Sequence, residues 1–156
     1  MPSVANLDRL LALENTNDIV IELDNAISDL CAYGEEIEKL TEPQKNFFYN
    51  QSLEKEINNG GFKQYFMNSS GDCAHETIQS LKIIGAHKTA AILQQAIDEF
   101  PSGQVPKDWS KRNELLESIE DRADEIWEGL DQQFYNYDDD LNSLNLEYVI
   151  QNRSSF

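Results

Sequence analysis

Basic residues and long apolar runs are scarce in this chain of 156 residues. It contains 12 Lys and Arg against 29 Asp and Glu, so its formal net charge is −17. Nucleic acids and anionic lipids both attract basic surfaces, so this balance argues against direct binding to either. No run of about 18 apolar residues is present to span a membrane. The first residues also lack the basic and apolar regions of a secretory signal. We therefore expect a cytoplasmic protein.

Residue patterns that carry chemistry are also scarce. The two cysteines, Cys31 and Cys73, lie in apolar helical patterns, and we expect free buried thiols. The two histidines, His75 and His87, do not form a metal-ligand spacing with Cys73. No Cys-x-x-Cys pair and no nucleophile elbow is present. We therefore expect a protein that is not an enzyme and needs no cofactor.

Apolar periodicity and capping residues predict helices along almost the whole chain. The expected helices cover residues 16–33, 41–59, 72–84, 87–100, 110–136 and 139–151, with further helical turns at 62–67 and a loop at 101–110. Thr16 or Asn17 is expected to cap the first, and Thr41 with Gln44 forms a capping-box pattern. The only candidate strand, DIVIEL, lies in a helical context. We predict an all-α fold, a single compact multi-helix domain over residues 1–156 with a long acidic C-terminal helix.

The stretch NNGGFKQYFMNSSGD, residues 58–72, combines a glycine pair with three aromatic residues. A phosphate-binding loop would need a lysine and a hydroxyl after the second glycine, but Phe62 follows Gly61. Phe62, Tyr65 and Phe66 instead recur at the spacing of one helix face, which predicts a core anchor. Asn59 and Gly60 are expected to stop the preceding helix.

Negative charge is concentrated at the two ends of the chain. Residues 1–42 hold ten acids and two bases, and residues 98–156 hold fifteen acids and five bases. Residues 43–97, with four acids and five bases, are nearly neutral. Any function that depends on negative charge is therefore expected in the flanking regions.

The predicted helix 110–136 carries two stripes at helical spacing. The acidic stripe consists of Glu114, Glu117, Asp121, Asp124, Glu128 and Asp131, and the apolar stripe of Leu116, Ile119, Ala123, Ile126 and Leu130. The stripes lie on nearly opposite sides of the helix, so the acids are expected to face water or a partner. Their charge spacing of roughly 4 to 5 Å along the axis is comparable with the ~3.4 Å of one DNA strand.

Two interpretations fit the acidic stripe. It is either a solvated face that keeps the protein soluble or a binding surface for a basic partner. Asp138, Asp139 and Asp140 could extend the row, and Asp18, Glu22 and Asp29 form a second, shorter acidic face on the N-terminal helix.

Residues 136–147 offer a third, weaker alternative. Asn136, Asp138, Asp140 and Asn142 fall at positions 1, 3, 5 and 7 of a calcium-loop register, with Glu147 at position 12. Position 6 is Leu141, where the loop requires glycine. The same residues also fit a helix start, where acids interact favourably with the helix dipole.

Three segments together resemble the bacterial DNA mimic protein family: EKEINNGGFKQYFMNSSGD, TIQSLKIIGAHKTAAIL and LDQQFYNY with LNLEYVIQN. The resemblance covers roughly residues 20–152 and is most specific from Glu56 to Asn68. Its signature residues are Gly60, Gly61, Phe62, Tyr65, Phe66, Asn68 and Gly85. Members of this family are similar in being small, helical and acidic.

The resemblance implies a homodimer whose surface carboxylates imitate DNA phosphates and occupy the DNA-binding face of a transcription factor. The signature lies in the neutral middle of the chain, so it assigns this role to no individual carboxylate. Our hypothesis from the sequence is therefore a DNA mimic that binds a basic DNA-binding protein through the acidic stripes. The alternatives are a general protein-interaction module with a merely solubilising acidic surface and a calcium-binding protein.

Overall fold

The computed structural model describes residues 2–156 and contains, over that range, seven α-helices, five short 3-10 segments and no β-strand. The helices are α1 (Leu7–Leu11), α2 (Thr16–Leu30), α3 (Glu42–Met67), α4 (Ala74–Ile83), α5 (His87–Ile97), α6 (Trp109–Tyr135) and α7 (Leu141–Gln151). The 3-10 segments are η1 (Ala32–Gly34), η2 (Ile37–Lys39), η3 (Ser69–Cys73), η4 (Pro101–Gly103) and η5 (Arg153–Ser155). The all-α prediction is confirmed.

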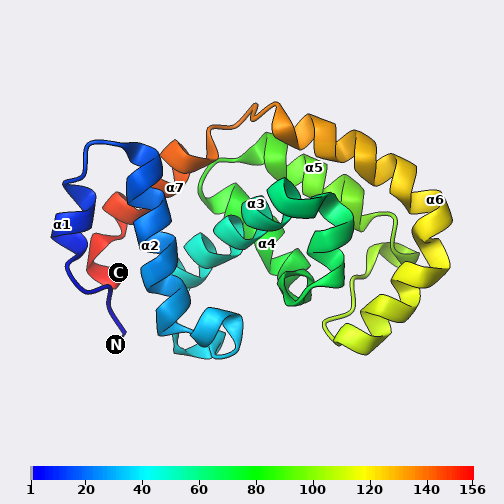
Figure 1. Ribbon diagram of the computed structural model, residues 1–156, viewed down its shortest axis with the longest axis horizontal. Helices are drawn as coiled ribbons and strands as arrows, with labels where there is room; N and C mark the ends of the chain where they lie inside the picture. Colours follow the sequence, from blue (N-terminus) through cyan, green and yellow to red (C-terminus); the bar gives the residue numbers. More distant parts are fainter. Residues whose placement is uncertain (1) are drawn as a thin grey trace.

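Helix α3 lies at the centre of the fold and contacts α2, α4, α6 and α7 (Figure 1). Its start is the predicted capping box, in which the Thr41 hydroxyl accepts from the Gln44 backbone and the Gln44 side chain accepts from the Thr41 backbone. The predicted stop at Asn59 and Gly60 is instead a sharp bend at Gly60 and Gly61 inside one helical element. Both glycines leave helical geometry, and Gly61 has φ 75°.

The hydrophobic core has two clusters of buried side chains. The larger one contains the predicted anchor Phe62, Tyr65 and Phe66, all with 0% of their surface exposed, which confirms that prediction. Phe66 packs against Phe100 and Trp127, with ring centroids 4.9 and 5.3 Å away. The smaller cluster joins α2 and the start of α3 to the C-terminal residue, Phe156.

The chain ends lie next to each other at one end of the molecule (Figure 1), and the Val4 amide donates to the Phe156 carbonyl. Helix α1 was not predicted. Asn15, rather than Thr16 or Asn17, caps α2 by accepting from the Asn17 and Asp18 amides. Helix α4 follows the unpredicted segment η3 and therefore begins two residues later than expected.

Helix α6 buries the predicted apolar stripe with one exception. Leu116, Ile119, Ala123 and Leu130 are buried, but Ile126 is 41% exposed and Trp127 is buried in its place. Both positions suit the 3-and-4 spacing after Ala123, and the larger ring of Trp127 fills the core beside Phe66. Within residues 2–156, no helix is long and apolar enough to cross a membrane.

Candidate functional site: the acidic face of helix α6

Helix α6 presents a row of exposed carboxylates along its solvent side. Asp108 caps the helix by accepting from the Lys111 amide at 2.9 Å. The exposed row consists of Glu114, Glu117, Asp121, Glu125 and Glu128. Within residues 2–156 none of these five carboxylates takes part in an ion pair. Glu125 was not among the predicted residues, although it follows Asp121 by one helical turn.

Two members of the predicted stripe, Asp124 and Asp131, are partly exposed and also contact α3. Lys63 on α3 pairs with Asp124 at 3.0 Å and with Glu120 at 3.3 Å. Asp131 accepts a hydrogen bond from the Phe62 amide at 2.8 Å, directly after the bend at Gly61. Asp124 and Asp131, which the spacing placed on the stripe facing water or a partner, are therefore engaged within the molecule, because α3 supplies a cation and a backbone donor.

The proposed extension of the row is shorter than predicted. Asp139 accepts from both the amide and the hydroxyl of Thr89, at 2.7 and 2.9 Å, and so caps the start of α5. Asp140 caps α7 by accepting from the Ser143 amide and hydroxyl. Of the three acids, Asp138 is left as an exposed carboxylate without such a capping role.

The calcium-loop register does not form a loop. Helix α7 begins at Leu141, so positions 6 to 12 of the register are helical, and Leu141 is buried. Asn136 ends α6, Asp138 and Asp140 lie before α7, and Glu147 lies in its second turn. The helix-start interpretation is confirmed. Among the residues described, no group of three or more His, Cys, Asp or Glu is placed to hold a metal ion.

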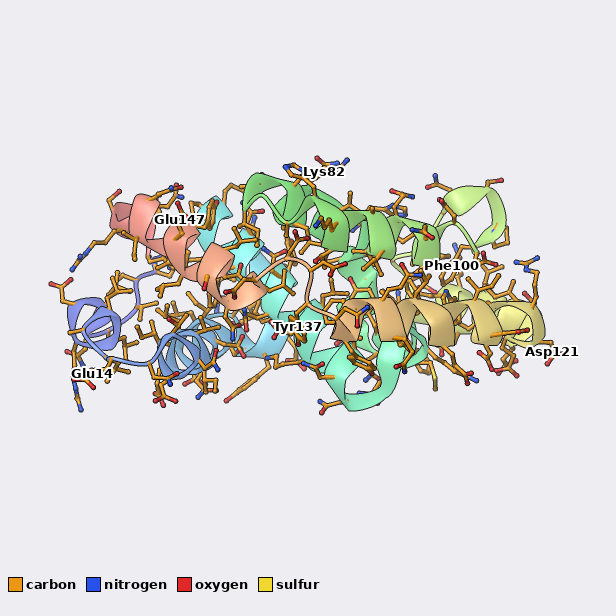
Figure 2. The ribbon with its side chains drawn as sticks, turned by 90° about the horizontal axis from the view of Figure 1, so that it is seen from above. Glu14, Lys82, Phe100, Asp121, Tyr137 and Glu147 are labelled. Carbon is orange, nitrogen blue, oxygen red and sulfur yellow. The ribbon has the colours of Figure 1, made fainter. Side chains whose placement is uncertain are left out.

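The second acidic face, on α2, is exposed at Asp18, Glu22 and Asp29. Asp29 accepts from the Tyr33 hydroxyl at 2.8 Å. Helices α2 and α6 lie towards opposite ends of the long axis, and Figure 2 shows Asp121 at the end far from Glu14. The structure therefore does not combine the two acidic faces into one row.

Most of the signature residues lie in the second half of α3, at its joint with α6, and Gly85 follows α4. Asn68, at the end of α3, donates from its side chain to Glu56. Gly85 follows α4 in a left-handed conformation with φ 86°. Gly71 lies so close to α3 that a Cβ at this position would approach the Tyr65 carbonyl to 2.9 Å.

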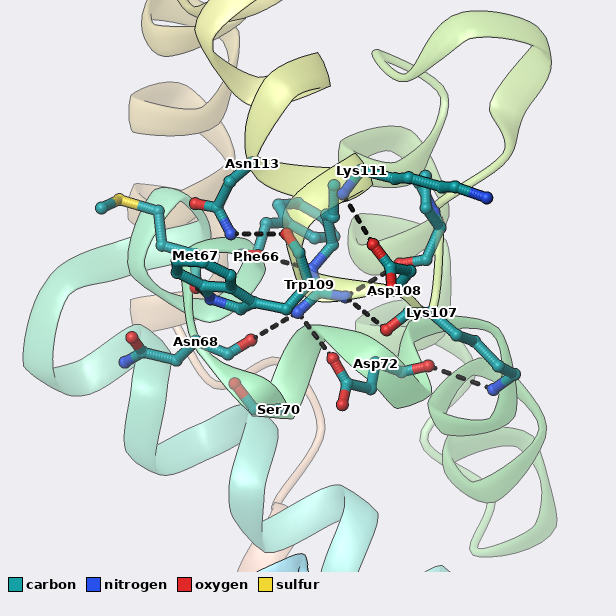
Figure 3. A network of polar contacts seen from close by, with 12 residues as sticks. Phe66, Met67, Asn68, Ser70, Asp72, Lys107, Asp108, Trp109, Lys111 and Asn113 are labelled. Carbon is teal, nitrogen blue, oxygen red and sulfur yellow. Dashed lines mark hydrogen bonds and ion pairs between the residues drawn. The ribbon is translucent and has the colours of Figure 1, made fainter.

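A buried arginine that the sequence analysis did not single out holds this joint. Arg112 is fully buried, and its guanidinium donates to the carbonyls of Phe66, Asn68, Pro106 and Lys107. It also pairs with Asp72 at 2.6 Å. Figure 3 shows Phe66, Asn68, Asp72 and Lys107 gathered around this network, with Trp109 donating to the Met67 carbonyl beside it. The sequence signal for the burial of Arg112 was its position four residues before Leu116, on the buried stripe.

An open depression of about 400 Å³ interrupts the acidic face at Gly129. Glu125, Glu128, Asp131 and Tyr135 border it. A Cβ at Gly129 would meet no atom within 4 Å. The glycine therefore has no steric reason to be in the middle of this helix, and it leaves room beside the carboxylates for a side chain from another molecule.

We expect Gly129→Ala to stabilise the protein by about 0.5–1 kcal/mol, because glycine loses more backbone entropy than alanine on entering a helix. Urea denaturation followed by circular dichroism measures this change. Loss of stability in this variant would show that Gly129 has a packing role absent from the structure.

Glu54 is a half-buried carboxyl with an unusual environment. The Tyr137 hydroxyl donates to its Oε1 at 3.1 Å, whereas its buried Oε2 has no hydrogen-bond partner. Burial raises the pKa of Glu54 above its usual value. The folded state therefore binds this proton more tightly than the unfolded state, and the ionised carboxylate destabilises the fold above the raised pKa.

We expect Glu54→Gln to be more stable than the parent protein at neutral pH, with the difference shrinking as pH falls through the raised pKa. Glutamine keeps the acceptor for Tyr137 and carries no charge. Paired urea denaturation curves from pH 4 to 8 measure the difference at each pH. A difference that is constant with pH would contradict the assignment to this carboxyl.

Comparison with known proteins gives a family match for the central and C-terminal parts of the chain. The family model described as DMP19-like protein matches residues 38–152. The match includes α3 to α7 and the exposed row but not α2 and its acidic face. Searches of curated proteins and of solved structures found no match.

Proposed function

Because the chain belongs to the DMP19-like protein family, we propose that the exposed row of α6 binds the basic DNA-contacting face of a DNA-binding protein and competes with DNA. The observation that supports this most directly is the row itself: five exposed carboxylates along one helix, none with an ion-pair partner within residues 2–156. A compensated surface would pair with neighbouring bases, but Lys63 on α3 pairs with Glu120 and Asp124, and Arg122 on α6 pairs with Glu99.

The spacing of the row suits a surface that normally contacts phosphates. The five carboxylates extend over 14 residue steps, about 21 Å of helix, or roughly one charge per 5 Å. A DNA strand presents one per ~3.4 Å, so the row is somewhat sparser. Lys and Arg side chains are long enough to adjust to that difference, and unscreened negative charge accelerates encounter with a basic surface.

The depression at Gly129 adds a place for a basic side chain to enter the row. A lysine or arginine seated beside Glu125 and Glu128 would lie over helix backbone that no side chain of this protein covers. We also propose a homodimer, as the family resemblance implies, which would present two such rows. Light scattering coupled to size-exclusion chromatography measures the molar mass in solution and so tests for the homodimer.

The experiment is capture of DNA-binding proteins from the native host, followed by competition with DNA at graded salt. The row variant replaces the five carboxylates of α6 by Gln or Asn: E114Q, E117Q, D121N, E125Q and E128Q. The matched control variant changes five exposed acids outside α6: E14Q, D18N, E22Q, E38Q and E147Q. Both variants carry the same net charge, so they differ only in where the carboxylates are removed.

We expect the row variant to bind the captured partner at least about tenfold more weakly at low salt, with a shallower salt dependence, and the control variant to bind nearly as well as the parent. Equal loss in both variants, as expected if net charge or the acidic face of α2 were responsible, would contradict the assignment of binding to the α6 row. Binding that survives row neutralisation and is insensitive to salt would favour the general interaction module. Absence of any DNA-binding protein among the captured partners would contradict the proposal.

A further inference from the structure

A cleft of about 450 Å³ lies away from the exposed row, between the turn that follows α2, the middle of α3 and the segment η3 that follows α3. Its walls come from η1, the middle of α3, η3 and the first turns of α4, and include Tyr33, Phe48, Tyr49 and Cys73. Figure 1 shows the turn after α2 and the end of α3 on the same side of the molecule. The volume is within the range of small-molecule sites.

One wall of the cleft is aromatic. Tyr33 is 75% exposed. Its backbone is left-handed, with φ 56° and ψ 33°, and its neighbours Ala32 and Gly34 also have positive φ. Non-glycine residues are held in this region only where the surrounding structure enforces it, and such residues gather at functional sites. The Tyr33 hydroxyl donates to Asp29, which makes the ring more electron-rich. Phe48 and Tyr49 lie edge to face beside it on α3.

The charged groups of the cleft leave an excess of negative charge. Lys55 pairs with Asp24 at 2.8 Å, and Asp72 pairs with the buried Arg112. The two remaining carboxylates on the wall, Glu35 and Glu56, have no ion-pair partner within residues 2–156.

Glu56 is fixed in place without being neutralised. Its Oε2 accepts from the side-chain amides of Gln64 and Asn68, at 2.8 and 3.0 Å. These neutral donors hold the carboxylate but leave its charge uncompensated. An anionic ligand would be repelled by the Glu56 carboxylate. A neutral apolar ligand would cover this carboxylate without supplying a positive charge.

We propose that this cleft binds an organic cation, an ammonium or guanidinium group carried on a short apolar stem. The cation lies against the Tyr33 ring and between Glu35 and Glu56, and the stem lies along Phe48 and Tyr49. Cation–π contact and the two carboxylates select the charge, while the aromatic wall selects the stem. This site is independent of the proposed function of α6.

The test uses n-butylguanidinium, with neutral n-butylurea as its control of equal shape. Cys73 lines the cleft and is partly exposed, whereas Cys31 is fully buried, so alkylation of Cys73 by iodoacetamide reports on the cleft itself. Burial raises the pKa of the Cys73 thiol, so the reaction is followed at alkaline pH, with the alkylated residue identified by mass spectrometry. Calorimetric titration with the same two compounds measures binding without relying on the thiol.

We expect n-butylguanidinium at ten times its Kd to slow alkylation of Cys73 roughly tenfold, as mass action requires, and n-butylurea to have little effect. Tyr33→Ala should weaken binding about two- to tenfold, the range of a cation–π contact, and Glu35→Gln should also weaken it. The five-residue row variant of α6 should bind n-butylguanidinium as the parent does. Equal protection by both compounds, loss of protection in the row variant, or absence of both protection and heat would overturn the proposal.

Discussion

Replacing Arg112 with methionine is expected to lower the free energy of unfolding by about 3–5 kcal/mol. The guanidinium is fully buried and donates to four backbone carbonyls at the end of α3 and in the loop before α6. Methionine fills a similar volume but leaves those carbonyls without their donor and the Asp72 carboxylate without its ion-pair partner. Against a typical total of about 5–15 kcal/mol, this is a large fraction.

Two further variants separate the hydrogen-bonding geometry from charge. Arg112→Lys keeps the charge but has no planar fork, so we expect it to recover only part of the loss. Arg122→Met removes an exposed arginine that bonds Glu99, and we expect a change below about 1 kcal/mol. Urea denaturation followed by circular dichroism measures all three. A loss below ~1 kcal/mol for Arg112→Met would contradict the role of this network in joining α3 to α6.

The helices and most of the core could be predicted because their signals are local. The capping box at Thr41 and the aromatic spacing from Phe62 to Phe66 lie within a few residues of each other, and the structure confirms both. The choice between Ile126 and Trp127 for the buried side of α6 is not local. Both residues satisfy the helical period, and the space beside Phe66 and Phe100 is filled by the large indole ring of Trp127.

The roles of individual acids depend on contacts between distant segments, and the sequence analysis could not assign them. Asp131 and Glu128 look alike in the periodicity, but Asp131 meets the Phe62 amide 69 positions away in the chain. Asp139 likewise caps a helix that starts about 50 residues earlier. Glu125 was overlooked because Asp124 and Glu125 both follow Asp121 by about one helical turn, and the predicted stripe included only Asp124. Arg112 lies four residues before Leu116 on the buried stripe, but its partners are backbone carbonyls of other segments, which the sequence pattern does not reveal.

The second large effect is expected at Gly61, where alanine should lower the free energy of unfolding by about 2–4 kcal/mol. Gly61 has φ 75° and ψ −173°, a conformation that residues with a Cβ rarely adopt. A Cβ there would also lie 2.2 Å from Oδ2 of Asp131. Alanine must therefore either distort the bend in α3 or displace the carboxylate that accepts from the Phe62 amide.

Asp131→Ala alone should cost about 1–3 kcal/mol, because it leaves the Phe62 amide without its acceptor. In the double variant, the carboxylate that would clash with the methyl group introduced by Gly61→Ala is absent. The loss in the double variant should therefore be smaller than the sum of the two single losses, with a coupling of about 0.5–3 kcal/mol. Additive losses would show that the clash does not contribute and that backbone strain alone explains the effect at Gly61.

Gly85→Ala provides the control for backbone strain without a clash. Gly85 has φ 86°, but a Cβ there would meet no atom within 4 Å. Its loss should be limited to about 1–2 kcal/mol, the usual penalty of a left-handed residue. Together with Gly129, where alanine should stabilise, the three glycines separate strain plus clash, strain alone and neither. If Gly61→Ala were no less stable than Gly85→Ala, the close approach of Asp131 to the bend in α3 would be refuted.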